Sequence, residues 1–410
     1  MSERFSSEFF AANRERLRQL FSGTAPIVVS AAGLLQRGGD SSYPFVQDAN
    51  FWYLTGIDEP DILLVLDKDK EYLIVPLRET RRAVFDGMVN RQDLSNRSGI
   101  KTVIDEKEGW KQLGNRLKRA KHVATIAAPP AYIEQYGIYT NPARTTLIKK
   151  LKELNDSIEL LDLSSHLVHM RMIKQPVELS AIQEAIDITI DTLKAATKPT
   201  KLGGYDYEYE LEAELTKGFR KRGATGHAFE PIVAAGLRAC TVHNFANNGA
   251  FASGELVVCD VGAEVEHYAA DITRTFARNQ PSKRQQAVYA AVLEVQDYAK
   301  SLLKPGILLK GYEQQVEQFM GEKLRALGLI KNVEHDTVRA FYPHGTSHFL
   351  GLNVHDAGDY MQPLAPGMVL TVEPGIYIAA EAIGIRVEDD VLVTEDGIVT
   401  LTERLPRALH

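Results

Sequence analysis

Five short segments in the second half of the chain set acids or histidines among apolar residues. A carboxylate buried without a partner is costly, so an acid that interrupts an apolar β-type run indicates a paired or functional side chain. In chain order, the candidate residues of these segments are Asp260, Asp271, His348, Glu373 and Glu388. Their number and order within one predicted domain favour a shared site over five unrelated charges.

Two of the acids are eleven residues apart in the sequence. Asp260 follows the apolar residues 257–259, and Asp271 opens the run Asp-Ile-Thr-Arg-Thr-Phe at 271–276. A strand, a connection through residues 262–267 and a returning strand would bring the two carboxylates face to face. Like charges that close need a cation between them, or one of the two must hold a proton.

The other three segments are weaker when each is taken alone. His348 closes the string His-Gly-Thr-Ser-His, Glu373 precedes Pro-Gly, and Glu388 follows Arg-Val. A histidine in a glycine-rich stretch is usually solvated or satisfied in the core, and a glutamate before Pro-Gly can simply start a turn. An Arg-x-Glu pair can lie on a strand surface. The co-occurrence of all five segments is what favours chemistry.

These strings resemble those of the pita-bread metallopeptidases, a family that includes methionine aminopeptidase, prolidase and aminopeptidase P. The resemblance covers roughly residues 170–410 and is carried by the strings at 271–276, 344–348 and 372–375. The stretch Ser42-Tyr-Pro-Phe-Val-Gln-Asp-Ala-Asn-Phe-Trp-Tyr-Leu-Thr-Gly56 is similar to one in the N-terminal domain of Xaa-Pro aminopeptidases. Methionine aminopeptidases lack that domain, so the resemblance favours the Xaa-Pro aminopeptidases.

The resemblance implies a two-domain α+β fold. A smaller mixed α/β domain of the aminopeptidase P type is expected at residues 1–170, and a pita-bread catalytic domain at residues 171–410. The expected reaction is hydrolysis of the peptide bond between an N-terminal residue and a penultimate proline.

The resemblance also implies a centre of two divalent metal ions. Asp271 and Glu388 would bridge the ions, Asp260 would hold one ion, and His348 with Glu373 would hold the other. This oxygen-rich donor set favours Mn²⁺, with Co²⁺, Fe²⁺ or Zn²⁺ as alternatives. A hydroxide bridging the two ions would be the nucleophile, and Glu373 would carry a proton from it toward the leaving nitrogen.

Further roles follow from the same resemblance. His243 and His355 would hydrogen-bond the scissile region and stabilise the tetrahedral oxyanion. His344 would line the pocket for proline. Arg386 and Tyr377 match positions that support the ligands, and Arg386 would orient a ligating carboxylate. For each of these five residues, a purely structural role is the alternative.

Two departures from the family pattern affect the expected substrate pocket. The family often has Tyr after His243 and Trp after His348, whereas this chain has Asn244-Phe245 and Phe349. Substrate preference is therefore more open than the metal chemistry. The first alternative is prolidase, which cleaves only Xaa-Pro dipeptides with the same ligands. The second is a catalytically silent pita-bread binding module, against which the five intact positions argue.

Helices and short strands that alternate irregularly must position these residues. Helical periodicity predicts helices at residues 6–21, 110–121, 141–154, 176–197, 207–222 and 282–303. Apolar β-type runs predict strands at residues 26–30, 61–66, 71–75, 256–261, 271–276, 368–372 and 391–393. The strands gather toward the C-terminus, which indicates α+β architecture.

Composition narrows the class of protein. The formal net charge of −7 over 410 residues argues against a general nucleic-acid binder. No run approaches the roughly 18 apolar residues of a membrane span, and the charged segment 1–21 lacks the apolar core of a secretory signal. We therefore expect a cytoplasmic enzyme that acts on peptides with proline in second position and has no nucleic-acid or membrane partner. The resemblance implies a homodimer or a homotetramer.

Overall fold

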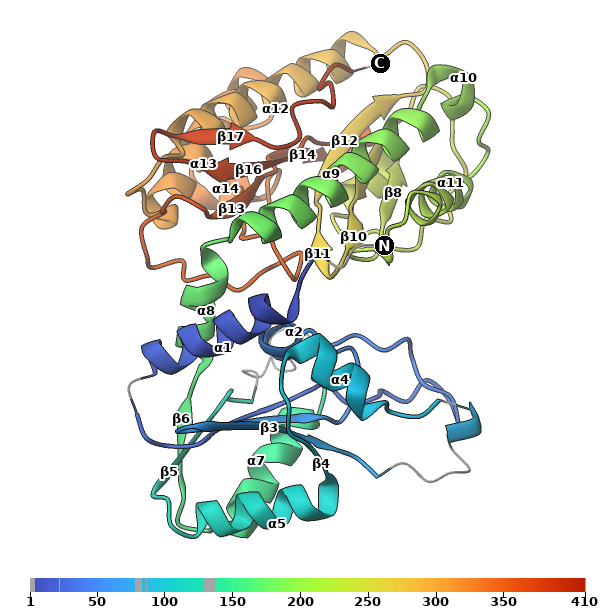
Figure 1. The fold of residues 1–410 in the computed structure, drawn as a ribbon. Helices are drawn as coiled ribbons and strands as arrows, with labels where there is room; N and C mark the ends of the chain where they lie inside the picture. The colour runs from blue at the N-terminus through green and yellow to red at the C-terminus, as the bar shows by residue number, and fades with distance from the viewer. Residues whose placement is uncertain (1–3, 22, 78–82, 86, 129–136, 410) are drawn as a thin grey trace. The chain divides into compact units, whose positions relative to one another are not determined.

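Two units divide the chain, Met1–Met170 and Arg171–His410, and each has its own helices and sheets (Figure 1). The computed structural model describes residues 4–21, 23–77, 83–85, 87–128 and 137–409. Helix α8 (Ser164–Met172) spans the boundary between the units. None of the described helices combines the length and the apolar character that a membrane crossing requires.

The first unit is built on a mixed six-stranded sheet with the order β4-β3-β2-β1-β5-β6. Strands β1, β2 and β3 pair antiparallel, whereas β4, β5 and β6 join in parallel. The strands are β1 (Ile27–Ser30), β2 (Leu63–Asp67), β3 (Lys70–Val75), β4 (Val103–Asp105), β5 (His122–Thr125) and β6 (Glu159–Asp162). The described helices are α1 (Ser7–Leu20), α2 (Ala49–Thr55), α4 (Arg91–Ser98), α5 (Glu106–Leu117) and α7 (Ala143–Leu154).

Local signals explain where helix α2 begins and ends. The Asp48 carboxylate accepts hydrogen bonds from the backbone N–H groups of Asn50 and Phe51, which satisfies donors that have no partner within the helix. Gly56 then ends the helix with φ +68°, a left-handed conformation that suits glycine. The segment 42–56, which carried the resemblance in this half of the chain, therefore holds a short capped helix.

The second unit carries its sheets between helices. Figure 1 shows α9 and α11 beside the strands β8 to β12, and α12 beside β13 to β17. The helices are α9 (Pro176–Ala196), α10 (Pro199–Leu202), α11 (Glu208–Lys221), α12 (Lys283–Leu302), α13 (Leu309–Ala326) and α14 (His335–Arg339). Two short 3₁₀ helices, η1 (Gly236–Cys240) and η2 (Ala379–Glu381), interrupt the strands.

The strands of the second unit form four small sheets with the orders β12-β9-β8, β11-β10-β7, β13-β16-β17 and β14-β15. The earlier strands are β7 (Gly226–His227), β8 (Ile232–Ala235), β9 (Leu256–Val261), β10 (Ala263–Val265), β11 (Tyr268–Ala269) and β12 (Ile272–Ala277). The later strands are β13 (Val369–Val372), β14 (Gly375–Ile378), β15 (Ile383–Arg386), β16 (Asp389–Val393) and β17 (Ile398–Thr400). All pairs in these sheets are antiparallel.

The helices predicted at 176–197, 207–222 and 282–303 are confirmed to within one residue at each end by α9, α11 and α12. The returning strand predicted after Asp260 is also confirmed. The connection between the two strands is more structured than expected, because β10 and β11 form a hairpin within it. Its turn residues Glu266 and His267 have φ +46° and +71°, as a tight turn between antiparallel strands requires. Helix α13 was missed.

Candidate metal centre

The pairing of β9 with β12 places the two aspartates on one face. Asp260 belongs to β9 and pairs with Thr273 of β12. Asp271 stands two residues before Thr273, and side chains two residues apart on a strand point to the same side. Asp260 and Asp271 are therefore diagonal neighbours across the pair rather than directly opposed, and Asp271 is only 5% exposed.

The two glutamates follow or precede strands of the other sheets. Glu373 comes directly after β13, and Glu388 lies between β15 and β16. The backbone N–H of Glu388 donates to the carbonyl of Thr273 at 3.0 Å. The Thr273 hydroxyl donates to Oε2 of Glu388 at 2.7 Å. These two hydrogen bonds tie the segment that carries Glu388 to strand β12, beside the aspartates.

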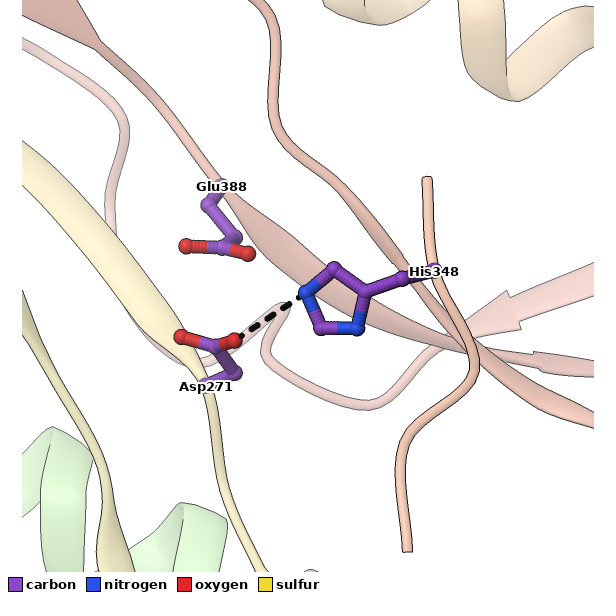
Figure 2. A group of neighbouring side chains, drawn as sticks. All are labelled: Asp271, His348 and Glu388. Atoms are coloured by element: carbon purple, nitrogen blue, oxygen red, sulfur yellow. Dashed lines mark ion pairs between the residues drawn. The ribbon is translucent and has the colours of Figure 1, made fainter. Parts of the chain in front are cut away.

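His348 enters the same space from the loop before β13. Its backbone pairs with Thr371, accepting at 3.0 Å and donating to the hydroxyl at 3.2 Å. Its Nε2 lies 3.4 Å from Oδ2 of Asp271 and 3.5 Å from Oε1 of Glu373. Figure 2 shows the side chains of Asp271, His348 and Glu388 turned toward one another, and one ligand atom from each lies within 4.8 Å of the others.

Burial and mutual repulsion disfavour ionisation of these acids. Burial raises the pKa of Asp271 well above its ordinary value, and the charges of Asp260, Asp390 and Glu373 raise it further. Burial likewise raises the pKa of Glu388, with Asp271 as the next cause. Burial raises the pKa of Glu373 to about 7, against the lowering effect of His348. A cation among the carboxylates would remove the repulsion.

The donor set fits such a cation. Oδ1 of Asp260 is buried and has no hydrogen-bond partner among the described residues, while Oδ2 accepts from Arg386 at 2.6 Å. A buried carboxylate oxygen without a donor is expensive unless it binds a cation. Several carboxylates and one imidazole converge here, which are donors that Mn²⁺ and related divalent ions accept.

Arg386 links the aspartate side of the centre to Tyr377 and His344. Its Nη1 donates to the Tyr377 hydroxyl at 2.7 Å, and that hydroxyl lies 2.8 Å from Nε2 of His344. Nδ1 of His344 lies 2.8 Å from the carbonyl of Gly345 and therefore donates to it. Nε2 of His344 must then accept from Tyr377. Burial lowers the pKa of His344 to about 3, which agrees with this neutral tautomer.

The two remaining predicted histidines make different ring contacts. The ring of His355 stands edge-on to that of His348 with centroids 4.4 Å apart. The ring of His243 instead stacks on Phe245, with centroids 5.5 Å apart and planes 13° apart. Both imidazoles are exposed, as substrate-contacting side chains must be before substrate binds.

The structure also brings together residues to which the sequence had assigned no role. Asp390 accepts a hydrogen bond from the backbone N–H of Asp271 at 3.2 Å and is fully buried. Its neighbour Asp389 pairs with Arg274 and Lys300, each at 2.6 Å. The signal that could have found them is the run of three acids at 388–390 directly before an apolar strand.

Comparison with known proteins agrees with this geometry. Residues 180–395 match the model of metallopeptidase family M24, and residues 10–125 match the aminopeptidase P N-terminal domain. The chain is 33% identical to the Xaa-Pro aminopeptidase of Escherichia coli K12, over 98% of this chain and 96% of that protein. It is 35% identical to the Xaa-Pro aminopeptidase of Haemophilus influenzae, over 91% of this chain and 89% of that protein.

A solved structure shares the whole architecture. Zinc-substituted E. coli aminopeptidase P in complex with product superimposes with a TM-score of 0.87 at 29% identity. The match covers 98% of this chain and 96% of that one. Since both halves match in the same order, with an N-terminal domain before the pita-bread domain, the chain belongs to metallopeptidase family M24.

Proposed function

We propose that the chain is a metal-dependent exopeptidase that removes one N-terminal residue when proline is in the second position. The observation that carries this proposal is the cluster of Asp271, His348 and Glu388, whose two acids are buried, in a chain that matches both the M24 domain and the aminopeptidase P N-terminal domain. The two relatives named above are Xaa-Pro aminopeptidases, and this chain matches each of them over most of its length.

The ligand set that we propose has the five residues at the centre. Asp271 and Glu388 would bridge two divalent ions, Asp260 would hold one of them, and His348 with Glu373 would hold the other. The convergence of the carboxylates and the unpartnered oxygen of Asp260 support this assignment. The hard donor set favours Mn²⁺ as the native ion, with Co²⁺, Fe²⁺ or Zn²⁺ as alternatives.

Metal ions bound there would lower the pKa of a water molecule and polarise the scissile carbonyl. Glu373 is the residue that would move the proton. One of its oxygens lies 3.5 Å from Nε2 of His348, and the other lies 3.8 Å from Nδ1 of His344. Its carboxylate would take a proton from the attacking water and deliver it to the proline nitrogen, which then leaves as an amine.

The histidines and Arg386 would bind and orient. An N–H of His243 or His355 would donate to the carbonyl oxygen as that oxygen gains negative charge. His344, held neutral by Tyr377, would present its ring to the proline side chain. Arg386 would fix Asp260 through its 2.6 Å hydrogen bond, so that the other carboxylate oxygen faces the metal.

Specificity for proline has a physical basis in the amide itself. The bond before proline is a tertiary amide, so its nitrogen offers no hydrogen for recognition, and the ring fixes φ near −65°. An enzyme that cleaves this bond must therefore recognise the ring by shape and supply the proton for the leaving nitrogen. We assign the first task to the pocket that His344 lines and the second to Glu373.

The test is hydrolysis of an Xaa-Pro-Yaa tripeptide by protein treated with EDTA, before and after addition of Mn²⁺. We expect activity only with metal and none in Asp271→Ala. Asp187→Ala, which removes an exposed acid of the same unit, is the matched control and should keep full activity. Cleavage of Xaa-Pro dipeptides alone would favour prolidase. No turnover with Mn²⁺, or with Co²⁺, Fe²⁺ or Zn²⁺ in its place, would favour a silent binding module.

We also propose that the native protein is a cytoplasmic homodimer or homotetramer. Light scattering coupled to size-exclusion chromatography would measure the oligomeric state, and fractionation of source cells would locate the protein. A monomer in solution or a protein found mainly outside cells would contradict these two assignments without affecting the proposed reaction.

A further inference from the structure

The loop at residues 344–348 carries or contacts several residues of the proposed metal centre. It carries His344 at one end and His348 at the other. Between them, the carbonyl of Thr346 accepts the backbone N–H of Glu373 at 2.9 Å. Three residues with proposed roles therefore depend on the position of this one segment. It pairs with β13 through the carbonyls of Thr346 and His348, which leaves the backbone N–H groups of Thr346 and Ser347 to other partners.

A single carboxylate from helix α13 binds this loop. Both oxygens of Glu313 lie 3.0 Å from the backbone N–H of Thr346, and one of them also lies 3.1 Å from the backbone N–H of Ser347. The other accepts the Thr346 hydroxyl at 2.9 Å. Burial raises the pKa of Glu313, whereas the hydrogen bonds from Thr346 and Ser347 act in the opposite direction and favour the ionised carboxylate. Hydrogen bonds to an ionised acceptor are roughly twice as strong as neutral ones, so one side chain can fix two consecutive peptide groups.

Two tyrosine hydroxyls form further hydrogen bonds with the side chains of this loop. Tyr312, next to Glu313 on α13, shares a hydrogen bond with the Ser347 hydroxyl at 2.9 Å. Tyr342 shares one with the Thr346 hydroxyl at 2.6 Å. Thr346 and Tyr342 are fully buried, so water does not compete for these groups. The hydrogen bonds of the Glu313 carboxylate go to the backbone and hydroxyl of the loop.

We propose that Glu313 is a positioning residue that holds the 344–348 loop, and through it His348 and Glu373, in the geometry that binds metal. The inference rests on the proposed metal centre, but the contacts that carry it are independent of any ion. Residues that orient metal ligands typically contribute 10–100-fold to metal affinity or activity when they are removed. We assign Glu313 an effect of this size.

The experiment compares Glu313→Ala with Glu313→Gln and with Glu178→Ala. Glu178 is the matched control, because it is a buried carboxylate of the same unit that accepts one backbone N–H, from Gln175, and one hydroxyl, from Tyr268. It binds no part of the 344–348 loop among the described contacts. Both alanine variants should lower Tm, so Tm alone does not distinguish positioning from stability.

Two measurements make the distinction. The first is hydrogen exchange at Thr346 and Ser347 in metal-free protein, which Glu313→Ala should accelerate at least tenfold and Glu178→Ala should leave unchanged. The second is Mn²⁺ affinity by calorimetry, which Glu313→Ala should weaken about 10–100-fold. Glu313→Gln should have an affinity between those of the parent and Glu313→Ala. An amide oxygen in place of the shared oxygen can still accept both N–H groups, but it is neutral, and the amide NH₂ cannot accept from Thr346.

Unchanged exchange and unchanged Mn²⁺ affinity in a folded Glu313→Ala protein would overturn the proposal. The proposal would also be overturned if Glu313→Gln lost as much Mn²⁺ affinity as Glu313→Ala, because the two N–H bonds would then not be the cause. If Glu313→Ala does not fold, Glu313→Asp withdraws the carboxylate from the loop by one methylene group, and unchanged exchange and unchanged Mn²⁺ affinity in that variant would also overturn the proposal. Failure of the parent itself to bind Mn²⁺ would instead refute the proposed function.

Discussion

Asp389 is the buried acid whose removal should have the largest effect on the stability of the second unit. Its carboxylate accepts from Arg274 at 2.6 Å, from Lys300 at 2.6 Å, from the Thr402 hydroxyl at 2.6 Å and from Gln296 at 3.1 Å. Burial alone would raise the pKa of Asp389, but Arg274 and Lys300 hold it well below its ordinary value. The carboxylate is therefore ionised in the folded protein at neutral pH.

The loss of stability expected for Asp389→Asn depends on which partners Arg274 and Lys300 keep once the carboxylate charge is removed. Arg274 keeps backbone carbonyls as partners, including those of Thr273 and Leu405. Lys300 loses its charged partner. Removing one member of a buried ion pair costs roughly 3–5 kcal/mol, and the Asn oxygen can still accept one or two hydrogen bonds. We therefore expect a loss of about 3 kcal/mol, at the lower end of that range.

The assay must report on the second unit. Both tryptophans of the chain, Trp52 and Trp110, lie in the first unit, so tryptophan fluorescence would not follow this transition. Urea unfolding of the metal-free protein by far-ultraviolet circular dichroism is suitable. Asp187→Asn is the control, since its pair with Arg404 is about half exposed and should contribute less than about 1 kcal/mol.

The pH dependence gives a further check. The folded-state pKa of Asp389 is depressed, so its stabilisation is fully present above the unfolded value of roughly 3.9 and is lost as pH falls through the folded value. The difference between the parent and Asp389→Asn should accordingly be constant from pH 6 to pH 8 at about 3 kcal/mol. A difference below about 1 kcal/mol at pH 7 would refute the reasoning, because the ion pairs would then be offset by desolvation.

Three other changes have distinct expected outcomes. Burial lowers the pKa of His227 to about 4 from 6.5, so the unfolded chain takes up the proton first and folding stability falls as pH drops from about 6.5 to about 4. The variant His227→Gln lacks this imidazole, so its free energy of unfolding should fall by about 2 kcal/mol less than that of the parent over this pH range, a value that is discounted for partial solvent exposure. Urea titrations at each pH would measure the difference. In Gly262→Ala the new Cβ would lie 1.7 Å from the carbonyl oxygen of Ala270, so we expect at least about 2 kcal/mol of destabilisation by thermal unfolding, whereas Gly226→Ala has open space. Arg386→Lys cannot contact its carboxylate and phenol partners together, so tripeptide hydrolysis should fall at least about tenfold.

Each of these expectations has an outcome that would contradict it. A parent and a His227→Gln protein with parallel stability curves between pH 7 and pH 4.5 would mean that the imidazole is solvated. Equal melting temperatures for the two glycine variants would mean that the strand ends can move apart. Full activity in Arg386→Lys would mean that the carboxylate of Asp260 needs no fixed orientation.

The local pattern of residues was enough to locate the main elements and the candidate acids. Helix α9 begins with Pro176 and keeps a helical period to Ala196. Strand β9 is a short apolar run, and β12 alternates apolar residues with Thr and Arg. Asp260 was recognisable because it interrupts an apolar run, and Asp271 because it opens the run at 271–276; both are local features. The ligand roles of the five candidate residues stay predictions, although the structure places their segments around one buried space.

The tertiary structure decided which acid does what in the run at 388–390. Glu388 contacts Thr273, Asp389 turns to Arg274 and Lys300, and Asp390 accepts from the backbone of Asp271. Successive side chains alternate between the two faces of a strand. The spacing therefore shows that neighbours point apart, but which face meets the centre depends on the sheet that packs there.

Glu313 shows the same limit more sharply. Glu313 lies 33 residues before Thr346 in the sequence. It is partly buried at the edge of the apolar face of helix α13, a position where glutamate is common. No local period, motif or spacing distinguishes it from Glu317 one turn later. Only the packing of α13 against the rest of the second unit brings its carboxylate to two peptide N–H groups, because contacts between segments distant in sequence are set by the whole fold.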